Sequence, residues 1–216
     1  MKLIIGNKNY SSWSLRAWLV MRVNGIAFEE ERIPLDLPDS KASILKHSPA
    51  GKVPVLIDGD MSIWDTMAIA EYLAEKFPLL RIWPQEPKAR AYARSVSAEM
   101  HSGFAALRSA MPMNCRGSYP GKGRSPACVA DITRITALWE QCRERCGQEN
   151  AFLFGEFSAA DAFYAPVTSR FITYGVPLTA ISERYVRAVS ALPAMREWVA
   201  AAEAENESIA ADEPYR

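Results

Sequence analysis

The sequence carries no excess of charge of either sign. Lysine and arginine together number 25, and aspartate and glutamate also number 25, so the formal net charge is zero. Proteins that attract nucleic acid or anionic lipid through a broad electrostatic field carry a surplus of positive charge. The balance therefore argues against a nucleic-acid partner and against a charged membrane surface, while a local basic pocket stays compatible with it.

Long apolar runs are absent as well. No stretch approaches the roughly 20 consecutive apolar residues that a membrane-spanning helix needs. Residues 1–6 are too short for the apolar region of a secretory signal, and the polar residues 7–9 interrupt them. We therefore expect a cytoplasmic protein without a membrane partner. Hydrophobic residues make up 49% of the chain, which is enough to bury a core without disulfides or structural metals.

Cysteine is scarce, and its pattern does not indicate a disulfide framework. The four cysteines all lie in the second half of the chain, and no two of them have the C-x-x-C spacing. We interpret three of them as small core residues of a helix, with a reactive or redox-sensing thiol as the alternative. They share one helical face, marked by steps of three and four, with apolar residues: Cys128, Ile132, Ile135, Trp139, Cys142 and Cys146.

The first 77 residues alternate short strands with helices. A helix that is apolar nearly all round is expected to lie between layers, and Asp58-Gly59 is a strong signal for a hairpin turn. Two strands joined through a helix run parallel, and a hairpin adds antiparallel strands, so we predict a small mixed sheet covered by helices. The expected strands cover 2–6, 28–34, 53–58 and 61–64, and the expected helices cover 14–24, 39–47 and 66–77.

Prolines between 78 and 87 mark a linker, and the pattern beyond it is helical throughout. We therefore expect a first domain at 1–78, a linker at 79–87 and a second domain at 88–216, in a fold of α/β plus all-α class. The segment 112–126 is long for a connection in a compact bundle, and it is either a lid or pocket edge or a solvated loop. Helices are expected over 88–111, 127–146, 159–174, 183–191 and 194–204.

A run of hydroxyl side chains, from Tyr10 to Ser14, follows the first expected strand. One serine at a helix start usually caps free N–H groups, but three serines in four positions exceed what one cap needs. The N-terminus of a helix also favours a nearby anion, so a serine hydroxyl there could stabilise a bound thiolate. A serine hydrolase is disfavoured, because there is no G-x-S-x-G elbow and neither His47 nor His101 has the context of a catalytic triad.

Two further polar motifs stand at expected element starts. Val53-Pro54 opens a strand, where a cis peptide bond would turn the Val53 backbone outward to pair with an extended peptide ligand. A trans proline at a strand start is the plainer alternative. Asp65-Thr66 opens a helix, with Thr66 as its expected N-cap. The pair either matches the ammonium and carboxylate of an α-amino acid or simply caps the helix.

A capping pattern starts the helix expected over 159–174. In Ser158-x-x-Asp161 the two side chains can satisfy each other's backbone N–H groups, although glutamate is commoner at the later position. We therefore assign Asp161 a structural role and not a catalytic one.

Taken in order, these motifs resemble the cytosolic glutathione transferase superfamily over nearly the whole chain. The family has a thioredoxin-like N-terminal domain followed by a helical-bundle C-terminal domain, usually paired into homodimers, and we expect both features here. The Ser11-Ser12 pair before Arg16 is most similar to serine-type, zeta-like bacterial members. The resemblance rests on five pieces, each weak alone: the serine motif, Lys52-Val53-Pro54, Trp64-Asp65-Thr66 with 68–73, and the segments 157–162 and 192–198.

By this resemblance the chain binds glutathione as a co-substrate. Ser11 is the hydroxyl expected to face the thiol, with Ser12 as its rival because the motif can be read in two registers. Ser14 is expected to cap the helix. The resemblance places the other contacts on the Val53 backbone before Pro54 for the cysteinyl part, on Asp65 and Thr66 for the γ-glutamyl end, and on Lys41 or Lys52 for the glycine carboxylate.

The sequence contains little information about the electrophile site. Trp13 stands where zeta-like members often carry a cysteine. This departure argues against maleylacetoacetate isomerase and thiol–disulfide reductase activity, and it favours Trp13 as a wall of the electrophile pocket. The other candidates lie near the end of the helix expected over 88–111, where a helix end and a solvated loop explain them equally well: Arg108, Met111, Met113 and Tyr119.

The expected activity is that of a glutathione S-transferase, in which a serine hydroxyl activates the thiol for attack on a small hydrophobic electrophile. A free thiol has a pKa of about 8.5, and lowering it by about two units needs about 2.7 kcal/mol. One hydrogen bond to the thiolate supplies about 1.5–3 kcal/mol and the helix dipole about 0.3–1 kcal/mol, so no metal is expected. The alternatives are a glutathione-dependent isomerase or peroxidase, or a non-catalytic glutathione transferase-like binding protein.

Overall fold

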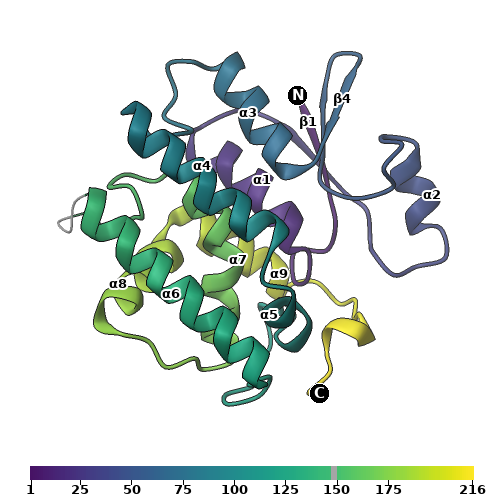
Figure 1. Cartoon of the computed structure of the whole chain (residues 1–216). Coiled ribbons are helices and arrows are strands. Elements are labelled where there is room, and N and C mark those ends of the chain that lie inside the picture. Colours follow the sequence, from purple (N-terminus) through teal and green to yellow (C-terminus); the bar gives the residue numbers. More distant parts are fainter. Residues whose placement is uncertain (147–149) are drawn as a thin grey trace.

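A four-stranded mixed sheet forms the N-terminal half of the molecule. The computed structural model (Figure 1) describes residues 1–146 and 150–216. Its strands lie in the order β2-β1-β3-β4. β1 runs parallel to β2, whereas β3 is antiparallel to β1 and to β4, so the predicted mixed sheet is confirmed. The strands are β1 (Lys2–Ile5), β2 (Glu29–Arg32), β3 (Val55–Asp58) and β4 (Met61–Trp64).

The hairpin between β3 and β4 follows directly from its sequence. Gly59 adopts a φ of +62°, a left-handed conformation that glycine reaches without strain. Asp58 pairs with Met61 across the turn, and β4 has the bounds that the sequence predicts. β3 begins at Val55, two residues later than predicted, because Pro54 has no N–H to offer a neighbouring strand.

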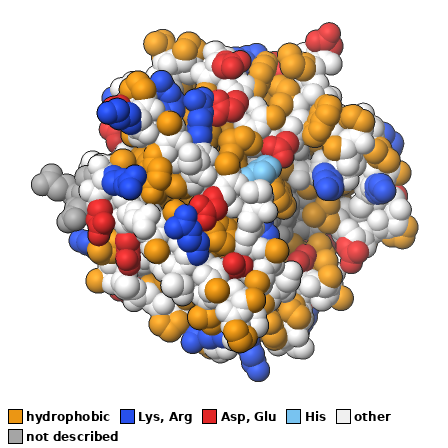
Figure 2. All heavy atoms as spheres, in the orientation of Figure 1, with side chains coloured by type: hydrophobic (Ala, Val, Ile, Leu, Met, Phe, Trp, Pro, Cys, Tyr) orange, Lys and Arg blue, Asp and Glu red, His pale blue; other side chains and the backbone are white. Residues whose placement is uncertain are grey.

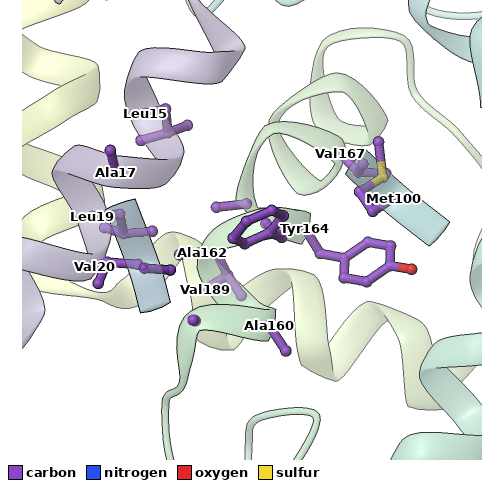
Figure 3. Close-up of a cluster of buried hydrophobic side chains, with 14 of the residues drawn as sticks. Leu15, Ala17, Leu19, Val20, Met100, Ala160, Ala162, Tyr164, Val167 and Val189 are labelled. Atoms are coloured by element: carbon purple, nitrogen blue, oxygen red, sulfur yellow. The ribbon is translucent and has the colours of Figure 1, made fainter. Parts of the chain in front are cut away.

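Three helices complete this half: α1 (Ser12–Val23), α2 (Ser40–Leu45) and α3 (Thr66–Lys76). α1 is the central one and packs against α3 on one side and against α7 and α9 of the helical half on the other. Its side chains Leu15, Leu19 and Val20 lie in the buried cluster that also holds Ala162 of α7 (Figure 3). The expectation that an all-round apolar helix lies between layers is confirmed, and it places the start of α1 where the two halves meet.

The second half is a helical bundle built around α7. This helix is buried along nearly all of its length and packs against α1, α4 and α8. Among the described residues, none of the helices has the length and apolar character needed to cross a bilayer. The helices are α4 (Pro87–Ser102), α5 (Ala105–Ala110), α6 (Pro126–Cys146), α7 (Ala159–Thr173), α8 (Ala180–Ala191) and α9 (Pro193–Glu203), followed by the 3₁₀ turn η1 (Ala210–Asp212).

The prediction of one helix over 88–111 is wrong, because two helices occupy this segment. α4 ends at Ser102, and Phe104 has a φ of +59°, so the chain turns before α5 begins. Gly103 permits the close approach, since a Cβ atom there would lie 2.7 Å from the carbonyl oxygen of Glu99. Arg108 Nε then donates to the Gly103 carbonyl at 3.0 Å, one of the groups that a helix end leaves free.

The capping box at the start of α7 is confirmed. Asp161 is fully buried, and its carboxylate accepts hydrogen bonds from the backbone N–H of Ser158 at 2.8 Å and of Leu153 at 3.0 Å. Burial raises the pKa of Asp161 to about 6, and these hydrogen bonds oppose that rise. The residue therefore fixes the segment before α7 to the helix.

The cysteines of α6 also lie as predicted. Cys128 and Cys142 are buried in the core beside Ile135 and Trp139, and Cys146 is half-buried at the end of the helix. Burial raises the pKa of Cys142 to about 12, which keeps the thiol protonated and unreactive at neutral pH.

Candidate active site

A cleft of about 900 Å³ lies where the N-terminal half meets the helical half. The surface is visibly hollowed there (Figure 2). The loop after β1, the segment before β3 and the start of α3 form one wall, and residues from α4, α5, α7 and η1 form the other. Most of the residues that the sequence singled out for glutathione line the first wall: Ser11, Ser12, Lys52, Val53, Pro54, Asp65 and Thr66.

The serine motif starts α1 in a different register from the one predicted. Ser11, not Ser14, is the N-cap, because its Oγ accepts a hydrogen bond from the Ser14 N–H at 3.3 Å. The Ser11 hydroxyl donates to Ser14 Oγ at 2.7 Å, and Ser14 Oγ accepts from the Gly6 N–H at 3.0 Å. Ser14 therefore ties the helix start to the end of β1 instead of capping the helix.

Ser12 differs from its neighbours in having a free hydroxyl. Both Ser11 and Ser12 line the cleft, but the Ser12 hydroxyl makes no hydrogen bond within the described part of the chain. It stands at the first residue of α1, where free backbone N–H groups create a positive field. The geometry thus offers one serine that is already hydrogen-bonded and one that is ready to donate.

The predicted cis peptide bond between Val53 and Pro54 is present. Both residues line the cleft just ahead of β3, and Lys52 lies beside them. Lys41 is exposed on α2 and is not one of the lining residues. Of the two lysines considered for a carboxylate, only Lys52 therefore stands at the cleft.

The cap of α3 is Asp65, so the prediction that Thr66 is the N-cap is wrong. Asp65 has a φ of +74°, an unusual conformation for a residue with a side chain, and its Oδ1 accepts from the Met67 N–H at 2.8 Å. This backbone turn brings the carboxylate over the helix start and leaves Thr66 as the first helical residue. A sequence pattern of Asp-Thr before a helix does not reveal which of the two makes the turn.

His101 completes this corner of the cleft, and sequence reasoning missed it because no motif surrounds this histidine. It comes from the end of α4, and its Nε2 lies 3.0 Å from Asp65 Oδ2. Burial lowers the pKa of His101, although Asp65 opposes the shift, so the ring is neutral at pH 7. Nε2–H then donates to Asp65, and Nδ1 accepts a long hydrogen bond from Thr66 Oγ1 at 3.5 Å. The helical half thus holds the start of α3 in place.

Three arginines lie in or close to this part of the cleft. Arg108 and Arg170 line the cleft, and Arg16 lies behind Trp13 with its guanidinium 4.2 Å from the centre of the indole ring. Arg170 is bound only to backbone carbonyls, with Nε 2.8 Å from the Met111 oxygen. Within the described chain, none of the three arginines has a carboxylate within ion-pair distance.

Arg16 is the most unusual of the three. It is fully buried, and all of its guanidinium nitrogens lack a hydrogen-bond partner among the described residues. Burial, followed by the fields of Arg108 and Arg170, lowers its pKa well below the usual range. Buried charges normally have partners, so this concentration of positive charge is suited to an anionic ligand.

The remaining predictions for the electrophile pocket divide in two. Trp13 and Arg108 line the cleft, and so do Pro112 and Met113 from the segment 112–126. Met111, which was predicted to line the electrophile pocket, is instead fully buried in the core. It directly follows the last residue of α5, Ala110, and its side chain packs inward. Tyr119 packs instead against Tyr174 and Tyr215, with ring centres 5.9 and 6.0 Å away.

The segment 112–126 combines both predicted alternatives: Pro112 and Met113 form an edge of the cleft, whereas most of 118–126 is exposed and is held to the bundle by hydrogen bonds. The backbone N–H of Tyr119 donates to the Thr173 carbonyl at 2.7 Å, and that of Gly121 donates to the Tyr174 carbonyl at 2.9 Å. Both acceptors lie at the end of α7. In the described ranges, no group of three or more histidine, cysteine, aspartate or glutamate side chains is arranged to hold a metal ion.

Solved structures share this fold. A glutathione transferase homologue from Burkholderia with bound glutathione is 24% identical, with a TM-score of 0.71, over 94% of this chain and 98% of that one. A maleyl pyruvate isomerase, a bacterial glutathione S-transferase of the zeta class, is 20% identical, with a TM-score of 0.73, over 96% of this chain and 100% of that one.

Sequence comparison places the chain in a family. A probable maleylacetoacetate isomerase of Caenorhabditis elegans is 30% identical over 135 residues, which cover 61% of this chain and 63% of that protein. The aligned part thus spans slightly less than two thirds of this curated relative. Models of the glutathione S-transferase N-terminal and C-terminal domains match residues 10–76 and 91–201. Because these two matches take up most of the sequence, the chain belongs to the glutathione S-transferase family.

Proposed function

We propose that this protein is a glutathione transferase that activates the thiol of glutathione with a serine hydroxyl. The observation that carries the proposal is the convergence of Ser11, Ser12, Val53, Asp65 and Thr66 on one wall of a single cleft. A protein that used the fold only for assembly would have no need to bring all of these groups together. The family membership and the glutathione bound to the Burkholderia homologue support the same assignment.

Glutathione is expected to bind along the first wall. The backbone of Val53 pairs with the cysteinyl part as an added strand would, and Lys52 attracts the glycine carboxylate. Asp65 receives the ammonium of the γ-glutamyl end, while the Thr66 hydroxyl and the Thr66 backbone N–H, which the cap leaves free at the start of α3, receive its carboxylate. His101 fixes Asp65 in this role by occupying one carboxylate oxygen.

The thiol then lies at the start of α1, within reach of the serines. A hydroxyl that donates to the thiolate contributes about 1.5–3 kcal/mol, and the field of the helix adds about 0.3–1 kcal/mol. Together they match the roughly 2.7 kcal/mol needed to lower the thiol pKa by two units. Ser11 is favoured by the family resemblance and Ser12 by its free hydroxyl, so both enter the test below.

The arginine cluster favours a second candidate, a glutathione-dependent isomerase of a carboxylate-bearing substrate. Arg108 and Arg170 line the same cleft as the serines and have no acidic partner among the described residues. A carboxylate bound there would place the adjacent carbons near the thiolate, whose reversible addition would permit rotation about a double bond. The names of the Caenorhabditis relative and of the zeta-class structure agree with this reading, whereas Trp13 replaces the cysteine frequent in such enzymes.

We also propose that the protein is a cytoplasmic homodimer, as the family resemblance implies. β4 is an edge strand of the sheet, and it exposes 47% of Met61 and 44% of Trp64, apolar surface of the kind that subunit contacts cover. Light scattering of the purified protein tests this part of the proposal, and a monomer at micromolar concentration would contradict it.

Calorimetry of glutathione binding tests the central proposal. We expect saturable binding with proton release near neutral pH, and loss of that proton release in Ser11→Ala or Ser12→Ala. Steady-state assays with an aryl halide, a hydroperoxide and a carboxylate-bearing cis alkene then separate transferase, peroxidase and isomerase chemistry. Absence of binding at millimolar glutathione would indicate a non-catalytic member of the family.

A further inference from the structure

The C-terminal tail, residues 205–216, is anchored to the N-terminal half next to the serine motif. The Glu205 carboxylate accepts hydrogen bonds from the backbone N–H groups of Lys8 at 2.7 Å and of Asn9 at 3.0 Å. Only 7% of the Glu205 side chain is exposed. The Tyr10 hydroxyl, one residue before Ser11, donates to Glu213 of the same tail. The loop that carries the serines therefore rests on the tail.

The tail is anchored to the helical half as well. Arg116 of the segment 112–126 donates to the backbone carbonyl of Glu207 at 2.7 Å and to that of Glu205. The Tyr215 hydroxyl donates to the Ala110 carbonyl at the end of α5 at 2.8 Å. Ile209, before η1, is almost fully buried. Anchors on both sides fix the course of the tail across the joint between the halves, where Figure 1 shows it in yellow.

These anchors place Asp212, the last residue of η1, at the cleft. Asp212 lines it together with Arg108 and Arg170, but no arginine comes within ion-pair distance of its carboxylate in the described structure. The other acid of the lining, Asp65, is already bound to His101 and to the start of α3. Asp212 is therefore an acceptor without an ion-pair partner in the described structure, on the same wall of the cleft as the donors Arg108 and Arg170.

We propose that Asp212, held in place by the anchored tail, lines the electrophile site and determines its specificity. The cleft would accept substrates that present one carboxylate to the arginines and a hydroxyl or enol group to Asp212. A second carboxylate at that position would meet a like charge in a partly desolvated cleft and be rejected. The inference rests on the proposed function and narrows its substrate class to hydroxy- or enol-bearing monocarboxylates.

Two small probes of matched size test the proposal on the full chain. Malonate carries two carboxylates, and 3-hydroxypropionate replaces one of them with a hydroxymethyl group. In titration calorimetry at pH 7, the wild type should prefer 3-hydroxypropionate. Asp212→Asn should shift the ratio of the two dissociation constants by about tenfold towards malonate, because it removes the opposing charge. Asp212→Glu should keep the preference of the wild type.

Glu207→Gln is the matched control, since it removes the same charge from the same tail at a residue that pairs with Arg32 away from the cleft. It should leave the ratio unchanged. An unaltered ratio in Asp212→Asn, an equal shift in Glu207→Gln, or no binding of either probe to any variant would overturn the proposal. Glutathione binding is measured separately, so a shifted ratio without glutathione binding would reject the transferase and retain the specificity assignment.

Discussion

The two walls of the cleft are built from different kinds of groups. On the wall assigned to glutathione, short side chains at element starts are hydrogen-bonded within the protein, as Ser11 is to Ser14 and Asp65 to the start of α3. On the opposite wall, Arg108 and Arg170 reach the cleft from the bundle and donate only to backbone carbonyls. The guanidinium of Arg16, on α1, lies buried near Trp13 without a hydrogen-bond partner. These arginines have no carboxylate within ion-pair distance in the described chain, whereas Asp65 on the first wall is hydrogen-bonded to the start of α3 and to His101.

This difference has a cost and a use. Satisfied groups at helix starts hold their geometry before a ligand arrives, which reduces the entropy lost on binding. Unpaired buried cations destabilise the fold, and they persist where a ligand that supplies the missing negative charge gives them a function. We infer that the first wall binds one invariant co-substrate. The arginines of the second wall are suited to bind the negative charge of the second substrate, which can vary.

The largest effect is expected from removing the donors of the first wall. Changing Ser11 and Ser12 together to alanine should raise the pKa of bound glutathione by up to about two units, from about 6.5 to about 8.5, which lowers the thiolate fraction and hence kcat/KM at pH 7 by up to about 25-fold. Glutathione affinity should change much less. Ultraviolet absorbance of the thiolate, followed across pH, measures the pKa directly.

The single variants then identify the hydroxyl that faces the thiol. If Ser11→Ala alone reproduces the loss, the assignment of Ser11 by family resemblance is supported. The Ser11 hydroxyl must then give up its hydrogen bond to Ser14 when glutathione binds. If Ser12→Ala alone reproduces the loss, the free hydroxyl is the donor and the assignment to Ser11 is wrong. Ser95→Ala serves as the control, because Ser95 is an exposed serine of α4 that does not line the cleft.

A smaller effect is expected from the corner where the halves meet. Asp65→Asn keeps a cap for α3 but removes the negative charge, so the dissociation constant of glutathione should rise by about 10-fold, equivalent to about 1.4 kcal/mol. His101→Gln should produce part of this loss, and the double variant should lose less than the sum, because both act on one carboxylate. Unchanged affinity in Asp65→Asn would refute the assigned role.

Local patterns predicted the framework of this molecule well. Turn chemistry at Asp58-Gly59, the capping box at Ser158 and Asp161, and the apolar face of α6 each depend on neighbours in sequence. The interaction that decides each of them spans only a few residues. The sequence therefore contained enough information for the sheet, most of the helices and the residues that line the first wall of the cleft.

The errors have a common physical origin. The choice of cap at α1 and α3 depends on backbone angles, such as the φ of +74° at Asp65, that side-chain chemistry alone does not specify. The positions of His101 and Arg16 depend on how the two halves pack. His101, for example, contacts Asp65, which lies 36 positions earlier in the chain. Pairings over that distance leave no periodic signal in a single sequence.

The buried charge of Arg16 should affect the stability of the protein. Arg16→Met removes a buried, unpaired charge and leaves a side chain of similar length between Trp13 and Phe163, so the free energy of unfolding should rise by about 1 kcal/mol. Arg22→Met on the same helix is the control, because Arg22 is exposed and paired with Glu197. It should change stability by less than about 0.5 kcal/mol. Urea unfolding at pH 7 measures both, and a clear loss in Arg16→Met would show that stacking on the rings outweighs the buried charge.

The smallest effect concerns the pH dependence of the first wall. The pKa of His101 is lowered in the folded protein, so between that value and the ordinary value of about 6.5 the unfolded chain binds more protons than the folded one. The contribution of His101 is therefore complete above about pH 6.5 and is lost as the pH falls through the folded-state pKa. One group contributes a slope of at most about 1.4 kcal/mol per pH unit. Urea unfolding across pH 5 to 7 should show this slope in the wild type and a shallower one in His101→Gln. Equal slopes would mean that the histidine titrates alike in both states and that the corner it shares with Asp65 is not held as the structure indicates.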